Sequence, residues 1–167
     1  MFVLGIDPGV SRCGYAVLDQ RAGRARAVAI GVLTTPAASP IHLRLAELQR
    51  ELRGLLQEFQ PAAVAVERVL FSNNARTAMS VGQASGLAMA EAAAAGCDVA
   101  QYSPNEIKQA IAGYGGAGKA QVQRMVQTLL DLPAPPHPPD AADAAAVALC
   151  HLAVAPLQAV VARGGRR

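Results

Sequence analysis

The 167-residue sequence has few charged residues, few cysteines and no long apolar run. Charged side chains make up 16 % of the chain and hydrophobic ones 52 %, a composition that excludes a disordered protein. Residues 85–100 form the most apolar helical stretch, but Glu91, Gly96 and Asp98 interrupt it. No apolar run in the sequence therefore approaches the roughly 20 residues that a membrane span needs. We therefore expect one folded core and no membrane segment.

The three cysteines indicate the compartment. Cys13, Cys97 and Cys150 are scattered and lack metal-ligand spacing, which is typical of a protein in a reducing environment. The first apolar run has no basic region before it and reaches Asp7 almost at once, unlike a signal peptide. These features predict a cytoplasmic protein.

The net charge of +3 comes entirely from the C-terminal arginines Arg163, Arg166 and Arg167. Without these three of the 15 basic residues, 12 basic and 12 acidic residues remain, and they cancel. Bulk charge therefore does not point to a nucleic-acid partner, and any such function depends on where particular charges lie.

Hydrophobic periodicity predicts an α/β protein in which strands come first and helices last. The expected strands cover residues 2–6, 13–19, 26–35, 62–67 and 98–102. The expected helices cover residues 45–59, 73–95, 104–112, 119–132 and 140–155. Short connections make the first three strands antiparallel, and helical crossovers make the later strands parallel, giving a five-stranded mixed sheet flanked by helices. We expect one domain over residues 1–156 and a flexible basic tail over residues 157–167.

Four acidic residues lie at the ends of apolar elements. Asp7 and Glu67 each end a predicted strand, and Asp140 and Asp143 lie three residues apart at the start of the last helix, on one face of it. Each alone fits a turn residue, a strand end or a helix cap. If the first and fourth strands are parallel neighbours, however, Asp7 and Glu67 emerge at the same edge of the sheet, where open α/β sheets bind their ligands.

Such a cluster has a specific chemistry. Neighbouring carboxylates repel one another unless cations neutralise them. Oxygen ligands without a histidine or cysteine cluster favour Mg²⁺ or Mn²⁺ over zinc. Two such ions about 4 Å apart orient a water molecule and stabilise the leaving oxygen of a phosphodiester, so no nucleophilic side chain is needed.

Several motifs in order resemble one known family. They are Gly5-Ile6-Asp7-Pro8-Gly9, Gly14-Tyr15, Val66-Glu67, Gly82-Gln83-Ala84, Lys108-Gln109, Lys119-Ala120-Gln121-Val122 and Asp140-Ala141-Ala142-Asp143-Ala144. From Leu4 to about Leu152 the chain resembles the RuvC family of Holliday-junction resolvases. The resemblance implies an RNase H-like nuclease domain, a homodimer and two Mg²⁺ ions per active site, with Mn²⁺ as a possible substitute. It also implies that Asp7, Glu67, Asp140 and Asp143 are the metal-binding catalytic residues.

The only two lysines are candidate DNA contacts. Lys119 begins a predicted helix, where the helix dipole disfavours a cation, so a phosphate-binding role competes with that of a solvated surface lysine. The resemblance assigns Lys108 and Lys119 to the substrate cleft, with Lys119 close to the scissile phosphate and part of the catalytic set.

The segment after Glu67 supplies further candidates for DNA binding. An aromatic residue beside amide and basic side chains suits an unstacked base and a phosphate. The candidates are Leu70, Phe71, Asn73 and Arg76, and either Leu70 or Phe71 would contact the junction bases. The alternative is that Phe71 packs in the core and Asn73 caps a helix.

Two other patterns need interpretation. Residues 113–119 match the G-x-x-x-x-G-K spacing of a phosphate loop, but residue 120 is alanine and the preceding element is a predicted helix, so we reject this interpretation. Small residues recur every four positions at Ala78, Gly82, Gly86, Ala90 and Ala94. This stripe either packs on its own sheet or forms a dimer contact across a two-fold axis.

The sequence therefore predicts a Mg²⁺-dependent endonuclease that makes paired symmetric nicks in four-way DNA junctions, in homologous recombination and DNA repair. The family resemblance also suggests the RuvA–RuvB branch-migration complex as a partner. Two alternatives stay open at this point: another RNase H-like nuclease, such as one that processes ribosomal RNA, and a junction-binding module without catalysis.

Overall fold

The computed structural model describes the backbone of residues 1–68 and 75–164 and the side chains of residues 1–68 and 78–155. Its centre is one five-stranded sheet with strand order β3-β2-β1-β4-β5. The strands are β1 (Phe2–Asp7), β2 (Arg12–Arg21), β3 (Arg24–Thr34), β4 (Ala63–Glu67) and β5 (Asp98–Tyr102). The first three strands are antiparallel, and β1, β4 and β5 are parallel, which confirms the predicted mixed sheet.

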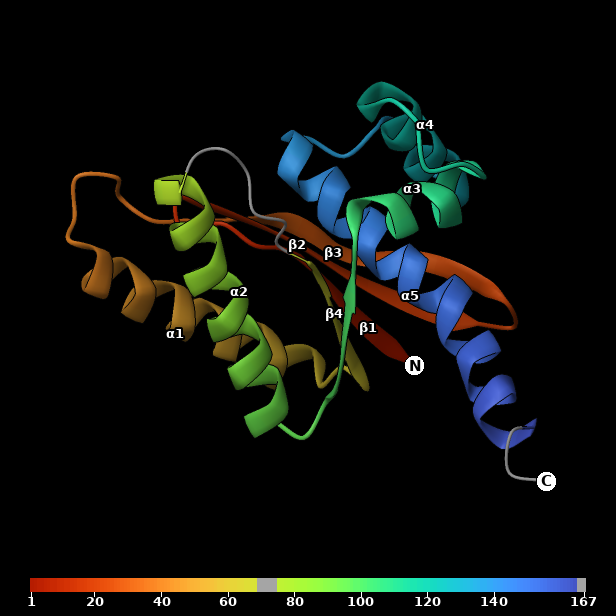
Figure 1. Ribbon diagram of the computed structural model, residues 1–167, viewed down its shortest axis with the longest axis horizontal. Helices are drawn as coiled ribbons and strands as arrows, with labels where there is room; N and C mark the ends of the chain where they lie inside the picture. The colour runs from red at the N-terminus through yellow and green to blue at the C-terminus, as the bar shows by residue number, and fades with distance from the viewer. Residues whose placement is uncertain (69–74, 165–167) are drawn as a thin grey trace.

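Helices cover both faces of this sheet (Figure 1). One face carries α1 (Ile41–Phe59) and α2 (Ala75–Ala94). The other carries α3 (Pro104–Ala112), α4 (Lys119–Leu129) and α5 (Pro139–Gly164). Of these, α5 lies across β1 and β2 and contacts all five strands.

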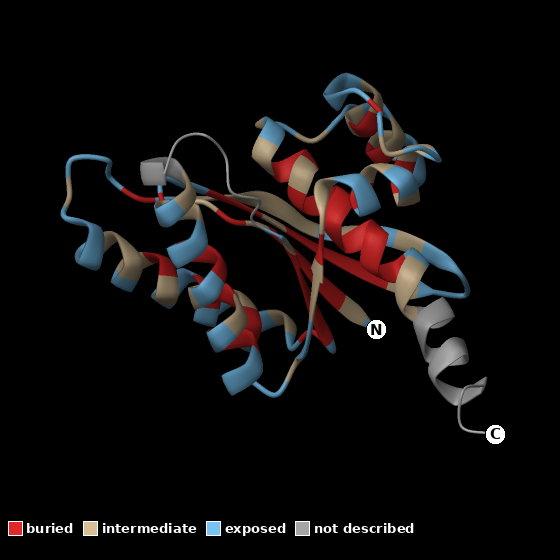
Figure 2. Cartoon of the chain, in the orientation of Figure 1, coloured by how far each residue is buried: buried red, intermediate tan, exposed pale blue. Residues whose placement is uncertain are grey.

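Strict alternation along the central strands separates two hydrophobic cores. In β1, Val3 packs toward α5, whereas Leu4 and Ile6 pack toward α1 and α2. Figure 2 shows the buried residues along the strands and on the helix faces that cover them. The same alternation places Asp7, two residues after Gly5, on the α5 face. Glu67 follows Ala63 and Ala65 onto that face in β4.

Two glycines allow α5 to lie directly on the sheet. A Cβ atom at Gly5 would come within 2.2 Å of the Ala144 carbonyl oxygen, and one at Gly14 within 2.1 Å of the Asp140 carbonyl oxygen. No side chain fits in that space, so glycine is required for the contact. The contact fixes the first turns of α5, and with them Asp140 and Asp143, beside the end of β1.

Three local features refine the predictions. The predicted end of the last helix, near Ala155, is wrong: α5 continues through Pro156 to Gly164, because residues 157–162 are mostly good helix formers. The loop at Gly113 follows α3 and not a strand, as expected when the phosphate-loop interpretation was rejected. Within the described residues, no helix is both long and apolar enough to cross a lipid bilayer.

Candidate active site: an acidic cluster at the carboxyl edge of the sheet

Asp7 and Glu67 lie side by side at the carboxyl ends of neighbouring parallel strands. The register pairs Ile6 of β1 with Val66 of β4, so the next residue of each strand is one of the two acids. Their side chains share a hydrogen bond, which raises the pKa of Asp7 and lowers that of Glu67. The sequence-based expectation that these two carboxylates meet is confirmed.

Burial and neighbouring acids raise the pKa of Asp7 from 3.8 to about 8. Loss of hydration is the largest cause, followed by the negative charge of Glu67 and then that of Asp143. The hydrogen bond with Glu67 and the charge of Asp140 raise the pKa further. All four predicted acids therefore act on one another around Asp7.

The pKa of Glu67 is also raised, chiefly by burial and secondarily by the charge of Asp143. The hydrogen bond from Asp7 and the positive charges of Lys119 and Lys108 act in the opposite direction. Both lysines thus lie within electrostatic reach of the cluster. A cavity of about 320 Å³ beside the cluster is lined by Glu67, Lys108, Lys119 and Asp143 together with residues of α3, α4 and α5.

Lys119 makes a direct ion pair with the cluster. Its Nζ atom donates a hydrogen bond to Oδ2 of Asp143 at 2.7 Å. This bond is the largest cause of a raised Lys119 pKa. Lys119 is the first residue of α4, as predicted, and the acid that holds it compensates for the unfavourable helix dipole.

Arg12 is a second basic partner, and sequence reasoning missed it. The Nε and Nη2 atoms of Arg12 lie 3.1 and 2.9 Å from Oδ2 of Asp140. The signal that could have found it is the alternation of β2: Arg12 is two residues before Gly14 and therefore lies on the same face as the acids. The contact of Gly5 and Gly14 with α5 was also not predicted, because the sequence shows these glycines only as parts of family motifs.

The donor set suits a hard divalent cation, because four carboxylates supply oxygen ligands and their repulsion favours neutralisation. As the side chains stand, however, the described residues contain no group of three acidic, histidine or cysteine side chains close enough together to hold a metal ion. In this arrangement Asp140 is paired with Arg12, and Asp143 is paired with Lys119. Metal binding would require these two carboxylates to turn toward Asp7 and Glu67.

Comparison with known proteins decides the family. The family model for crossover junction endodeoxyribonuclease RuvC matches residues 3–151. The chain belongs to the RuvC family. A curated RuvC from Syntrophomonas wolfei is 50 % identical over 152 residues, which cover 91 % of this chain and 88 % of the relative. A RuvC from Moorella thermoacetica is 48 % identical over 156 residues, which cover 93 % of each.

Solved structures agree with this assignment. Thermus thermophilus RuvC in complex with a Holliday junction substrate is 37 % identical and aligns over 95 % of this chain and 96 % of that one, with a TM-score of 0.89. The yeast mitochondrial Holliday junction resolvase shares the fold at 19 % identity and a TM-score of 0.67. The expected RNase H-like fold is confirmed, and RuvC proteins are metal-dependent DNA endonucleases.

The other predicted DNA contacts of this RuvC-family protein are not placed. Leu70, Phe71 and Asn73 lie outside the described residues, and Arg76 is described only as part of the α2 backbone. Their roles stay predictions. The family match spans all of these positions as well as the four acids and both lysines.

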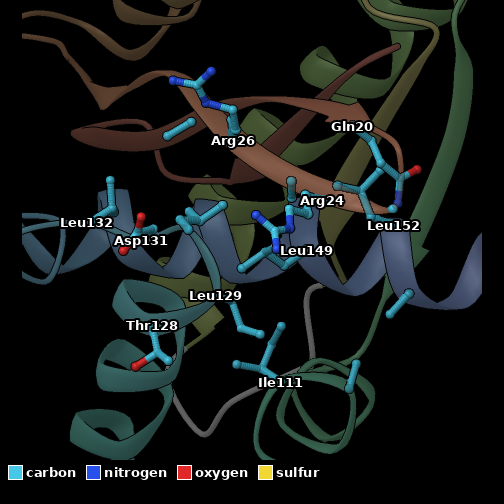
Figure 3. Close-up of a pocket in the computed structure, with 16 residues that line it drawn as sticks. Gln20, Arg24, Arg26, Ile111, Thr128, Leu129, Asp131, Leu132, Leu149 and Leu152 are labelled. Carbon is cyan, nitrogen blue, oxygen red and sulfur yellow. The ribbon is translucent and has the colours of Figure 1, made fainter.

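A larger cavity, of about 1000 Å³, lies elsewhere. Figure 3 shows it between the β2–β3 hairpin and α3, α4 and α5, with Arg24, Arg26, Ile111, Leu149 and Leu152 among its lining residues. None of the four acids lines it. The size of a cavity therefore does not identify the candidate active site in this fold. The cluster of four carboxylates identifies it.

Proposed function

We propose that this RuvC-family protein resolves Holliday junctions by paired symmetric nicks, in homologous recombination and DNA repair. The single observation that carries the proposal is the meeting of four carboxylates from β1, β4 and α5 around Asp7. Two findings support the choice of DNA junctions as substrate. They are the family match over residues 3–151 and the similarity to Thermus thermophilus RuvC in complex with a Holliday junction substrate.

Asp7, Glu67, Asp140 and Asp143 would hold two Mg²⁺ ions, with Mn²⁺ as a possible substitute. The bound ions would supply charge neutralisation at the phosphate and a water acidic enough to act as the nucleophile. The residues of the chain do the rest: the four carboxylates fix the site at the sheet edge, and Lys119 donates to a phosphate oxygen once Asp143 releases it. Lys108, on the same side of the cluster, would bind the DNA backbone.

The α2 helix supports a homodimer. Gly82, Gly86 and Ala90 of the small-residue stripe are exposed, whereas Ala84, Ala88 and Ala92 are buried against the sheet. Packing of the stripe on its own sheet is therefore wrong for these positions. An exposed smooth stripe leaves room for a close helix contact with a second copy. Two copies would place two active sites on one junction, as paired cuts demand. We also propose the RuvA–RuvB complex as a partner, on family resemblance alone.

The proposed function is tested by incubating the protein with a synthetic four-way DNA junction, a linear duplex of the same arm sequence and an RNA hairpin. Each is incubated once with Mg²⁺ and once with EDTA. We expect paired nicks in the junction with Mg²⁺ only. Equal cutting of the linear duplex, or cutting of the RNA alone, would contradict the proposal and favour another RNase H-like nuclease. Tight junction binding without cutting in Mg²⁺ would indicate a non-catalytic module.

A further inference from the structure

Arg12 lies on the β2 side of the acidic cluster, and its ion pair with Asp140 does not use all of its guanidinium N–H groups. It is the first residue of β2 and pairs with Thr34 of β3. Its Nε and Nη2 atoms both engage Oδ2 of Asp140, at 3.1 and 2.9 Å. Although it is held in this way, 49 % of the Arg12 side chain is exposed, against 29 % for Asp140.

The backbone that carries Arg12 is itself anchored. Arg44 of α1 donates from Nη2 to Ser11 Oγ at 2.5 Å and from Nε to Thr35 Oγ1 at 2.9 Å. The Thr35 hydroxyl donates to the Val10 carbonyl at 2.6 Å. These bonds join the loop before Arg12 to the end of β3 and to α1. Arg12 therefore extends from a fixed point, and Asp140 holds its far end.

The two acids of α5 are each paired with a basic residue from a different element. Lys119 of α4 holds Asp143, and Arg12 of β2 holds Asp140. A guanidinium has five N–H donors, and the ion pair with Asp140 uses one on Nε and one on Nη2. Its planar fork can therefore bind a carboxylate along one edge and a phosphate along another.

We propose that Arg12 binds a backbone phosphate of the DNA strand that crosses the acidic cluster, on the β2 side, and that Asp140 positions Arg12 until metal binding turns this carboxylate toward Asp7 and Glu67. The inference rests on the proposed function, because the ligand is the junction DNA. A phosphate contact of this kind fixes where the strand lies and does not read its sequence. It complements Lys108 and Lys119, which approach the cluster from α3 and α4.

The competing explanation is that Arg12 only neutralises Asp140. In that case removing Arg12 weakens DNA binding solely because Asp140 becomes an uncompensated negative charge. A variant pair separates the two explanations: Asp140→Asn removes the charge first, and Arg12→Ala is then added to it. Any loss that persists in this background belongs to Arg12 and the DNA.

The test measures junction binding in EDTA by fluorescence anisotropy over a series of NaCl concentrations. Relative to Asp140→Asn alone, we expect Asp140→Asn with Arg12→Ala to bind roughly fivefold more weakly. We also expect the slope of log K against log salt to become shallower by about 1, because one phosphate contact is lost. Arg12→Lys in the same background should keep most of that slope. The matched control is Arg50→Ala, an exposed arginine of α1, which should change neither quantity.

An unchanged affinity and salt slope in the double variant would overturn the inference. Thermal unfolding verifies that each variant folds, and Arg12→Gln, which keeps most of the side-chain length, replaces Arg12→Ala if the alanine variant does not. Failure of the proposed function looks different: Asp140→Asn alone would then bind a linear duplex as tightly as the junction. Junction preference without any effect of Arg12 would overturn only the role of Arg12.

Discussion

At the scale of single residues, Asp7 is the group whose chemistry depends most on its neighbours. Burial, followed by the negative charge of Glu67 and the smaller effects of Asp143 and Asp140, raises the pKa of Asp7 to about 8. Between the ordinary carboxyl value of 3.8 and about 8, the folded protein keeps a proton that the unfolded chain releases. Stability therefore falls as the pH rises through this window. The site is destabilising without a cation.

The first prediction concerns this destabilisation. In EDTA at pH 8, Asp7→Asn should raise the unfolding temperature by on the order of 5 °C, because an amide carries no charge to repel Glu67 and Asp143. The gain should shrink as the pH falls toward 3.8 and below, where the Asp7 carboxyl becomes protonated in the unfolded chain as well as in the folded protein. Differential scanning calorimetry at several pH values measures it. Mg²⁺ should raise the parent's unfolding temperature more than the variant's. A variant less stable than the parent at pH 8 in EDTA would contradict this explanation.

Single residues also mark how far the sequence could be interpreted. Asp7 and Glu67 could be predicted to meet, because each ends an apolar run and strand order follows from the lengths of the connections. The pairing of Arg12 with Asp140 could not, since it joins residues 128 positions apart and depends on where the first turn of α5 lies. The same holds for Lys119 and Asp143, which lie 24 positions apart on two different helices.

At the scale of elements, the contact between α5 and the β1–β2 pair positions half of the acidic cluster. Gly5 and Gly14 let the backbone of α5 approach the strands, and a Cβ atom at either would overlap a carbonyl oxygen of α5. Since Asp140 and Asp143 lie in the first turns of that helix, any displacement of α5 moves both acids away from Asp7. In the sequence these two glycines are only members of two family motifs. The packing of α5 against the strands shows why a residue without a side chain is needed at both positions.

The second prediction uses this contact. Gly14→Ala should lower the free energy of unfolding by about 3 kcal/mol, because the new methyl group overlaps the Asp140 carbonyl and α5 must shift. Cleavage should fall with it. The control is Gly54→Ala, in the exposed middle of α1 with nothing within 4 Å of the added Cβ. That variant should gain roughly 0.4–1 kcal/mol. Urea unfolding measures both, and a Gly14→Ala protein as stable as the parent would show that α5 does not rest on this glycine.

At the scale of the whole molecule, paired cutting requires two active sites on one junction. The exposed stripe of α2 offers a contact surface on the opposite side of the sheet from α5. A Cβ atom added at Gly86 meets nothing within 4 Å in the single chain. We therefore expect a side chain at this exposed position to be tolerated in the monomer and to obstruct a second helix only in a dimer.

The third prediction uses this difference between the monomer and a dimer. Gly86→Arg should fold but sediment as a monomer, and it should leave junctions with single nicks instead of paired ones. Gly54→Arg, also at an open helical position, should behave as the parent. Sedimentation velocity and denaturing gels of a junction labelled on two strands give both readouts. A dimeric Gly86→Arg protein that still makes paired cuts would place the dimer contact elsewhere.

The most direct test of the account is junction cleavage by Asp7→Asn in Mg²⁺, measured beside the binding of the same junction. The matched control is Asp98→Asn, an exposed acid at the start of β5, at the end of the sheet away from the cluster. We predict that Asp7→Asn binds the junction as the parent does but cuts it roughly 100-fold more slowly or worse, because one metal ligand is gone. Asp98→Asn should cut at the parent rate. Cutting at the parent rate by Asp7→Asn would show that the acidic cluster is not the catalytic site.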